Sequence, residues 1–176
     1  MKLIAQSERI YLRELNTSDA LSFYNLNIDF EVLKYTGDEP FKDIEDVKIF
    51  LKKYVKQYQN YKMGRWAICL NNTHKMIGWC GLKYHPKEKL ADIGYRLLKT
   101  QWNKGYATEA TQLALEYGFN KLNLKEIIAH VHEKNNASHK VILKAGLKYY
   151  KTIIYDNKPA RFYTLSKLHY LNKLGD

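Results

Sequence analysis

Residues 102–110, Trp-Asn-Lys-Gly-Tyr-Ala-Thr-Glu-Ala, lie between a predicted strand and a predicted helix. A glycine at such a turn leaves several backbone N–H groups unpaired at the positive end of the helix dipole, where a pyrophosphate binds well. Gly105 lets the backbone approach a phosphate, Ala107 keeps the next turn slim, and Lys104 adds a positive charge. By itself this is weak evidence, because many helices begin at a glycine and bind nothing.

A second segment, residues 135–147, follows about 30 residues later. Asn135 suits a helix N-cap, Ser138 falls in the first turn, and Gly146 suits a left-handed C-cap with Leu147 as its apolar contact. That structural explanation is complete without any function. The order and spacing of the two segments together are what indicate a function.

Together the segments resemble the GNAT superfamily of acetyl-CoA-dependent N-acetyltransferases, in the branch that includes the ribosomal-protein N-terminal acetyltransferases (RimJ/RimL-like). The family signature Gln/Arg-x-x-Gly-x-Gly/Ala is matched at Gly105 and Ala107. Trp102 replaces the usual Gln or Arg, and Asn103 stands where a glycine is common. The resemblance extends to residues 12–20 and 35–40, and therefore covers nearly the whole chain.

The resemblance implies acetyl-CoA as cosubstrate, with its pantetheine arm along residues 97–98 and its pyrophosphate on residues 103–108. The residues expected to bind it are Leu97, Leu98, Asn103, Lys104, Gly105, Tyr106, Ala107, Thr108, Asn135 and Ser138. It also implies that an amine attacks the thioester directly in a ternary complex. The sequence contains no pattern of an activated Cys or Ser nucleophile for a covalent route.

Three residues are candidates for the catalytic steps. Asp92, in Ala-Asp-Ile-Gly-Tyr, stands where this branch usually carries Glu and is the first candidate for the general base; the alternative is a structural carboxylate. Glu133 is the second candidate base, with a solvated charge as its alternative. In many relatives a tyrosine acts as the general acid at the position where this chain has Ile142, so the role of general acid is vacant here. Ser138 is expected near the thiol sulfur.

The sequence does not define the acceptor amine. Asp38 and Glu39, in the loop 37–41, are expected to form a substrate wall that receives a cationic amine. The net charge of +11 disfavours polyamines and strongly basic aminoglycosides. A protein or peptide N-terminus, an amino acid or a small neutral amine is therefore favoured.

Length and composition predict one domain over residues 1–176, since 45% of the residues are hydrophobic. No segment approaches the roughly 20 apolar residues of a membrane span, and the start lacks a signal-peptide core, so a cytoplasmic protein is expected. Cys69 and Cys80 are expected to be reduced, buried and inert. The six histidines show no metal-ligand spacing, and no metal is expected.

Two other classes of function remain open. One is a module that binds acetyl-CoA without catalysis, which the isoleucine at 142 favours. The other is a basic nucleic-acid-binding domain, but no known motif is present and acidic residues are interleaved throughout. We therefore expect neither a nucleic-acid nor a membrane partner, and a homodimer is left open.

The elements that must position these residues follow from hydrophobic periodicity and turn residues. Strands are predicted at residues 9–13, 66–70, 76–82, 91–98, 126–131, 149–155 and 161–166, and helices at 19–27, 44–58, 105–120 and 135–145. This order predicts an α/β fold with a mixed sheet. The resemblance implies the GNAT fold, with the central sheet splayed in a V between the fourth and fifth strands and flanked by about four helices.

Overall fold

The computed structural model describes residues 2–174 and contains a mixed sheet of eight strands in the order β1-β2-β3-β4-β5-β6-β8-β7. The strands are β1 Leu3–Gln6, β2 Ile10–Arg13, β3 Arg65–Leu70, β4 Met76–His85, β5 Leu90–Leu97, β6 Glu126–His132, β7 Lys148–Tyr155 and β8 Lys158–Ser166. The α-helices are α1 Ala20–Leu26, α2 Phe30–Leu33, α3 Ile44–Tyr54, α4 Lys56–Tyr61, α5 Tyr106–Glu116, α6 Asn136–Ala145 and α7 Lys167–Leu174. None of the helices within residues 2–174 is both long and apolar enough to cross a membrane.

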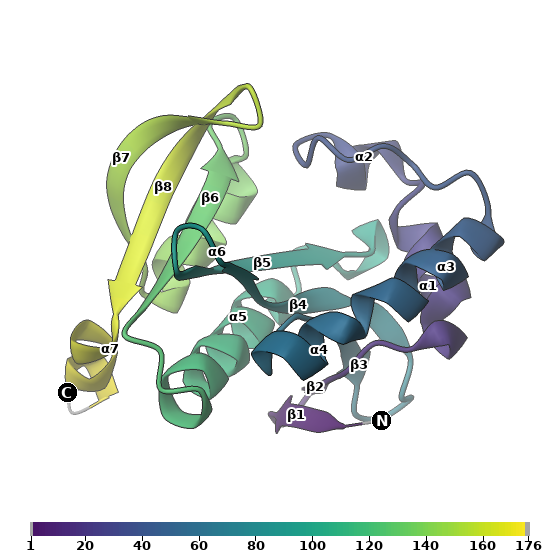
Figure 1. Cartoon of the computed structure of the whole chain (residues 1–176), viewed down its shortest axis with the longest axis horizontal. Helices are drawn as coiled ribbons and strands as arrows, with labels where there is room; N and C mark the ends of the chain where they lie inside the picture. Colours follow the sequence, from purple (N-terminus) through teal and green to yellow (C-terminus); the bar gives the residue numbers. More distant parts are fainter. Residues whose placement is uncertain (1, 175–176) are drawn as a thin grey trace.

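The sheet is split between β5 and β6. These two strands are parallel and pair only at Ala91 with Ile127 and Asp92 with Ile128, whereas all other neighbouring strands are antiparallel. Beyond Asp92 they diverge, so that β1–β5 form one arm and β6, β8 and β7 the other (Figure 1). The predicted V is thereby confirmed, because β5 and β6 are the fourth and fifth predicted strands.

Helices cover both faces of the first arm. Side chains alternate along β3, so Trp66 and Ile68 join the core cluster that includes α5, whereas Ala67 and Cys69 join the cluster under α1 and α3. Because both faces of β3 are buried, its sequence is almost continuously apolar. The first cluster continues across the split to Ile127 and Ala129 of β6, which joins the two arms at their base.

The two predicted helix signals at 135–147 are confirmed. The Asn135 side chain accepts a hydrogen bond from the Ser138 backbone amide at 3.1 Å and so caps α6. Gly146 ends that helix with φ +106°, and Leu147 beside it is buried in the core.

The described part of the chain contains more helices than the four expected. The predicted helix at 44–58 is divided at Val55 into α3 and α4, and α5 continues past Glu116 as the π-helical turn η3, Tyr117–Lys121. Among the strands and α-helices, β1, α2 and α7 were not predicted. β1 and α2 have only four residues each, too few to show a hydrophobic period.

Candidate active site

Two cavities lie at the V and meet there. The first cavity, of about 670 Å³, is lined by β5, the loop before α5, the start of α5, one side of α6, and α2 with the loop after it. The second cavity, of about 470 Å³, is lined by residues of all the strands from β3 to β8, of α3 and α6, and of the loop after α2. The residues shared by both are Tyr35, Thr36, Tyr95, Arg96, Asn135 and Ser138. Ligands in the two cavities would therefore meet at these six residues.

The turn before α5 shapes the first cavity. Gly105 is the N-cap of α5 with φ +84°, a conformation that favours glycine, and Asn103 also has a positive φ of +60°. Asn103, Gly105, Tyr106, Ala107 and Thr108 of this turn line the cavity. The unpaired amides of the first turn of α5 and the positive end of its dipole suit a pyrophosphate.

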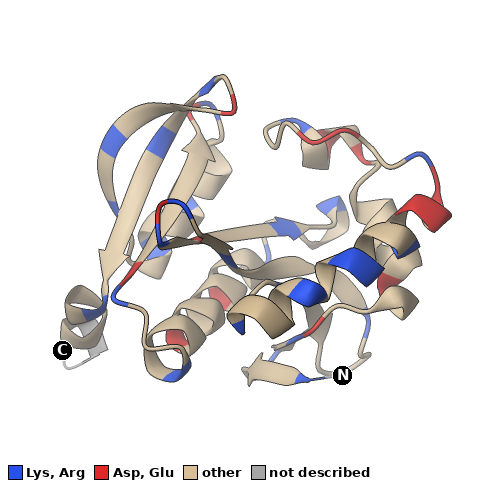
Figure 2. Cartoon of the chain, in the orientation of Figure 1, with Lys and Arg blue, Asp and Glu red and all other residues tan. Residues whose placement is uncertain are grey.

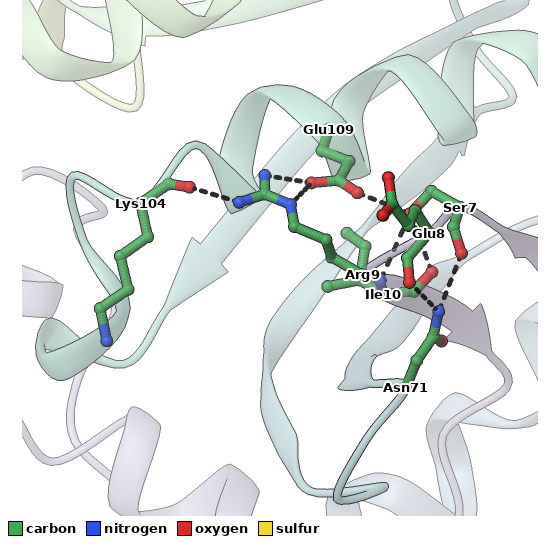
Figure 3. Close-up of polar contacts among 7 residues, drawn as sticks. All are labelled: Ser7, Glu8, Arg9, Ile10, Asn71, Lys104 and Glu109. Atoms are coloured by element: carbon green, nitrogen blue, oxygen red, sulfur yellow. Dashed lines mark hydrogen bonds and ion pairs between the residues drawn. The ribbon is translucent and has the colours of Figure 1, made fainter.

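Arg9 braces this turn from the start of β2 (Figure 3). Its Nη1 donates to the Lys104 carbonyl at 3.0 Å, and its Nε donates to Glu109 Oε2 at 2.9 Å. Glu109 also accepts from Ser7 Oγ at 2.7 Å, and Asn71 Nδ2 donates to the Ser7 carbonyl at 2.8 Å. The brace thus ties the turn to two segments that are distant in sequence, and nothing in the sequence around Arg9 indicated it.

Two hydroxyls are paired where the cavities meet. Tyr95 Oη donates to Ser138 Oγ at 2.9 Å, which joins β5 to the first turn of α6 across the V. Burial raises the pKa of Tyr95 to about 12, although the bond to Ser138 acts in the opposite direction, so Tyr95 stays protonated. Ile142 is buried and lines the second cavity, and its side chain has no proton to give.

Asp92 lies in the wall of the second cavity, held by two partners. Its Oδ2 accepts from Arg65 Nη2 at 2.6 Å, and its Oδ1 lies 2.7 Å from His85 Nε2. Burial would raise the pKa of Asp92, but the Arg65 guanidinium and the bond to His85 hold it well below its ordinary value. A carboxylate held in this way is a weak proton acceptor, which favours the structural alternative for Asp92.

A cluster of nitrogen-bearing side chains faces the second cavity. Arg96 is buried and donates through its Nη atoms to Asn27 Oδ1 and Asp38 Oδ2. Its Cζ lies 5.2 Å from the ring centroid of Trp79, and that of Arg65 lies 5.5 Å from the same centroid. Within residues 2–174, three buried side-chain nitrogens have no hydrogen-bond partner: Trp79 Nε1, Arg96 Nε and His130 Nδ1.

His130 projects from β6 into the second cavity. Its imidazole stacks on Tyr155 with ring centroids 4.1 Å apart and planes 9° apart. Burial lowers the pKa of His130 below its ordinary value, although the Asp92 carboxylate acts in the opposite direction. The imidazole is therefore neutral at pH 7 and carries a basic nitrogen.

The structure does not bring every predicted residue to a cavity. Leu97 lines the first cavity but Leu98 does not. The backbone amide of Leu98 donates to the Ile77 carbonyl at 3.0 Å. The Leu97 carbonyl accepts from the Trp102 indole at 3.0 Å, so these two backbone groups already have protein partners. Three further predicted residues, Lys104, Glu39 and Glu133, are exposed and line neither cavity.

Sequence reasoning missed several residues at the site: Arg9, Arg65, Trp79, Tyr95, Arg96 and His130. Tyr95 and Arg96 stand three and four positions after Asp92 on β5, so the run around Asp92 was a usable signal. Because they are consecutive on a strand, their side chains point to opposite faces, one toward α6 and one toward the loop after α2. The others come from three separate strands and from the bend before β2, and they gave no signal.

The predicted burial of the two cysteines is confirmed. Cys69 and Cys80 are free thiols with no exposed surface, and burial raises the pKa of Cys80 to about 12. Neither is a thiolate nucleophile at neutral pH. Within residues 2–174 no group of three His, Cys, Asp or Glu side chains could hold a metal ion.

A split mixed sheet, a glycine turn at a helix start beside the split and two cavities that meet there define an acyl-CoA-dependent transferase site. Comparison with known families agrees with this class. The family model described as the acetyltransferase (GNAT) domain matches residues 9–148. The chain belongs to the GNAT acetyltransferase family, whose members transfer an acyl group from acetyl-CoA.

Individual relatives and structures give the same result. The chain is 31% identical over 148 residues to an uncharacterized N-acetyltransferase of Bacillus subtilis, YoaA, with 82% of each chain covered. A GNAT-family acetyltransferase from Bacillus anthracis superposes with a TM-score of 0.81 at 25% identity, over 95% of this chain and 99% of that one. A spermidine N-acetyltransferase from Vibrio cholerae, solved with CoA and spermine, has a TM-score of 0.81 at 20% identity, over 94% of this chain and all of that one. The last likeness concerns the fold alone.

Proposed function

We propose that this protein transfers the acetyl group of acetyl-CoA to a primary amine by direct attack within a ternary complex. The observation that carries the proposal is the junction of the two cavities at Tyr95 and Ser138. A cofactor in the first cavity and an amine in the second would meet there, in the geometry that direct transfer needs. The two buried, protonated thiols cannot serve as nucleophiles for a covalent intermediate.

In the first cavity, acetyl-CoA would supply the thioester as the acetyl donor. The amides from Asn103 to Thr108 would hold its pyrophosphate. The pantetheine arm would follow β5 beyond Asp92, where β6 has moved away. Asn135 and Ser138, at the start of α6, would lie on the other side of the arm. Lys104 and Leu98 line neither cavity and are dropped from the proposed binding set.

His130 is the general base in this proposal. An ammonium cannot attack until it loses a proton, and His130 presents a neutral imidazole to the second cavity. Asp92, the first candidate from the sequence, has both oxygens occupied by Arg65 and His85. Glu133, the second candidate, lies outside the cavity. The base therefore comes from the strand opposite β5.

The Tyr95–Ser138 pair stabilises the leaving thiolate. Because Tyr95 donates to Ser138 Oγ, the hydroxyl hydrogen of Ser138 is free to point toward the thioester sulfur. As the amine nitrogen bonds to the carbonyl carbon and the C–S bond breaks, the sulfur would become negatively charged and accept this hydrogen bond. The proton that the nitrogen loses as it becomes the amide would then balance the charge of the thiolate, which leaves as the CoA thiol. The pair thereby takes over the role that Ile142 leaves vacant.

Finer assignments of branch, acceptor and location belong to the same proposal. The amino-acid sequence of residues 102–110 supports membership of the RimJ/RimL-like branch, with a protein or peptide N-terminus as an acceptor. A cytoplasmic location is supported by the two free thiols. The absence of nucleic-acid and membrane partners stays a prediction, and a homodimer stays one open alternative. Lys and Arg lie on both arms of the sheet with Asp and Glu among them (Figure 2). This distribution fits the expected absence of nucleic-acid and membrane partners.

A thiol-release assay with acetyl-CoA and a panel of primary amines tests the proposal. The panel contains amino acids, peptides with free N-termini, polyamines and aminoglycosides. We expect amine-dependent release of CoA, which falls about 10²–10⁴-fold in His130→Gln because the positioned base is lost. Calorimetry on the same protein measures acetyl-CoA binding. Binding without release on any amine would contradict the proposal and favour the non-catalytic binding module.

A further inference from the structure

The unpartnered nitrogens of the second cavity show what kind of ligand it takes. Trp79 Nε1, Arg96 Nε and His130 Nδ1 all belong to residues that line this cavity. Buried polar atoms in proteins nearly always have partners, so three orphans around one cavity indicate groups that a ligand completes. Trp Nε1 and Arg Nε are donors only, and their missing partner is therefore an acceptor.

The two donors are neighbours. Trp79 and Arg96 are paired directly across β4 and β5, so their side chains share one face of the sheet. The guanidinium carbon lies 5.2 Å from the indole centroid, and Arg96 is buried. One carboxylate, with two acceptor oxygens, can receive a hydrogen from each of them.

The charge of the cavity wall agrees with an anionic ligand. Lys or Arg residues line it at four positions, 65, 83, 96 and 158, and Asp residues at three, 38, 92 and 156. The Asp92 carboxylate is held by Arg65, so it is not available to a cationic ligand. Asp38 is the internal partner of Arg96, but its side chain is 61% exposed and lies on a loop. A ligand carboxylate can therefore take the place of Asp38.

Contacts across the V limit the size of the ligand. The Tyr35 ring, at the end of α2, lies 5.2 Å from the His132 ring of β6. A Cβ built on Gly37 would lie 3.7 Å from Lys158 Nζ, which brings that ammonium of β8 to the opposite loop. These contacts roof a space of about 470 Å³, which is in the range of small-molecule sites.

We propose that the acceptor is a small amine that carries a carboxylate, with the carboxylate bound by Arg96 and Trp79 and the amine directed to His130. This deepens the proposed function and rests on it. A free amino acid and a short peptide with an acidic side chain share this chemistry, and the assay separates them. A polyamine, which has no group for the two donors, is a poor acceptor.

Matched pairs of amines test the proposal: glycine, β-alanine and L-phenylalanine against their amides, together with the dipeptides Glu-Ala and Gln-Ala. We expect kcat/KM to be at least tenfold higher for the acid of each amino-acid pair. The amide has the less basic amine and is more deprotonated at neutral pH, so intrinsic reactivity would give the opposite order. A preference confined to Glu-Ala over Gln-Ala would assign the site to a peptide side chain.

Variants identify the donors. Trp79→Phe keeps an aromatic ring but removes the indole Nε1 donor. Arg96→Lys keeps the positive charge but removes the planar guanidinium with its several donors. Each should raise the KM for the acids about tenfold, and Trp79→Phe should leave the KM for acetyl-CoA unchanged because Trp79 does not line the first cavity. The exposed Arg161→Lys serves as the control. Asp38→Asn should lower the KM for the acids, because it removes the internal competitor. If Asp38 binds the ammonium instead, the same change raises that KM and overturns this part of the proposal.

The outcomes separate the two proposals. Equal turnover of acids and amides overturns the carboxylate site and leaves the acetyltransferase intact. If no amine turns over, the same pairs are compared by the shift in Tm that they cause in the CoA-bound protein. A larger shift for the acids than for the amides supports the carboxylate site even then, and equal shifts overturn it.

Discussion

The two cavities of this protein are built in different ways. The first takes most of its lining from two continuous segments, residues 95–108 and 135–144, and offers mainly the backbone groups of two helix starts. The second takes side chains from six strands, from α3 and α6 and from the loop after α2, and three of its buried nitrogens have no partner. A cavity that binds a constant group can be made from local backbone, whereas a cavity that selects an acceptor depends on side chains brought together from far apart.

The largest effect is expected from the wall of the second cavity. Asp92→Asn removes one partner of a buried ion pair and leaves Arg65 uncompensated, which costs about 3–5 kcal/mol of the free energy of unfolding. Because the folded pKa of Asp92 is depressed, the stabilisation is complete above the unfolded pKa of about 3.9 and is lost as the pH falls through the folded value. Urea unfolding between pH 7 and pH 3 should therefore show a gap between wild type and variant that narrows below about pH 4.

The same variant distinguishes the two roles of Asp92. In the folded fraction, kcat should fall by less than tenfold, since His130 supplies the base. A loss of 10²–10⁴-fold that recovers at high pH would assign the base to Asp92. A stability gap that does not change with pH would contradict the ion-pair explanation.

The next effect is expected at the junction of the cavities. Tyr95→Phe and Ser138→Ala each remove one member of a hydrogen-bonded pair that stabilises a thiolate, so kcat should fall roughly 10–100-fold. The KM for acetyl-CoA should change little, because the hydrogen bond from Ser138 to the thiolate forms only in the transition state. The double variant should lose no more than the stronger single variant, since the two hydroxyls act as one unit. Additive losses would show that they act independently.

A smaller effect is expected in the turn of the first cavity. Gly105→Val adds a branched side chain at φ +84°, beside Arg9 and the proposed phosphate site. The dissociation constant of acetyl-CoA should rise at least tenfold, about 1.4 kcal/mol, as measured by calorimetry. Gly146→Val is the matched control, because Gly146 also has a positive φ but lines neither cavity. An equal change in both variants would assign the effect to backbone strain.

The smallest effect is expected from the brace of that turn. Arg9→Gln should raise the KM for acetyl-CoA about threefold and change the free energy of unfolding by less than about 1 kcal/mol, because the Arg9 side chain is 47% exposed. Arg9→Lys keeps the positive charge but lacks the guanidinium group that donates to both the Lys104 carbonyl and the Glu109 carboxylate. If the brace matters, lysine does not restore the KM. Full rescue by lysine would mean that Arg9 acts as a charge alone.

The sequence by itself determined the fold class and the first cavity. Hydrophobic periodicity gave seven of the eight strands, and Asn135, Gly105 and Gly146 marked helix ends that the structure contains. These features depend on residues close together in the chain, because caps and turns are made by local backbone conformation. The glycine turn before α5 could be predicted for the same reason.

The tertiary structure alone decided the second cavity. Trp79 and Arg96 come together through the register of β4 and β5, Asp92 is neutralised by a residue 27 positions away, and His130 faces them from across the split. No local pattern records such meetings, since strand register and the divergence of β5 from β6 arise from packing over the whole sheet. The sequence therefore indicated that the Asp92 carboxylate lies at the site but could not show that Arg65 and His85 bind it. It gave no role to Tyr95.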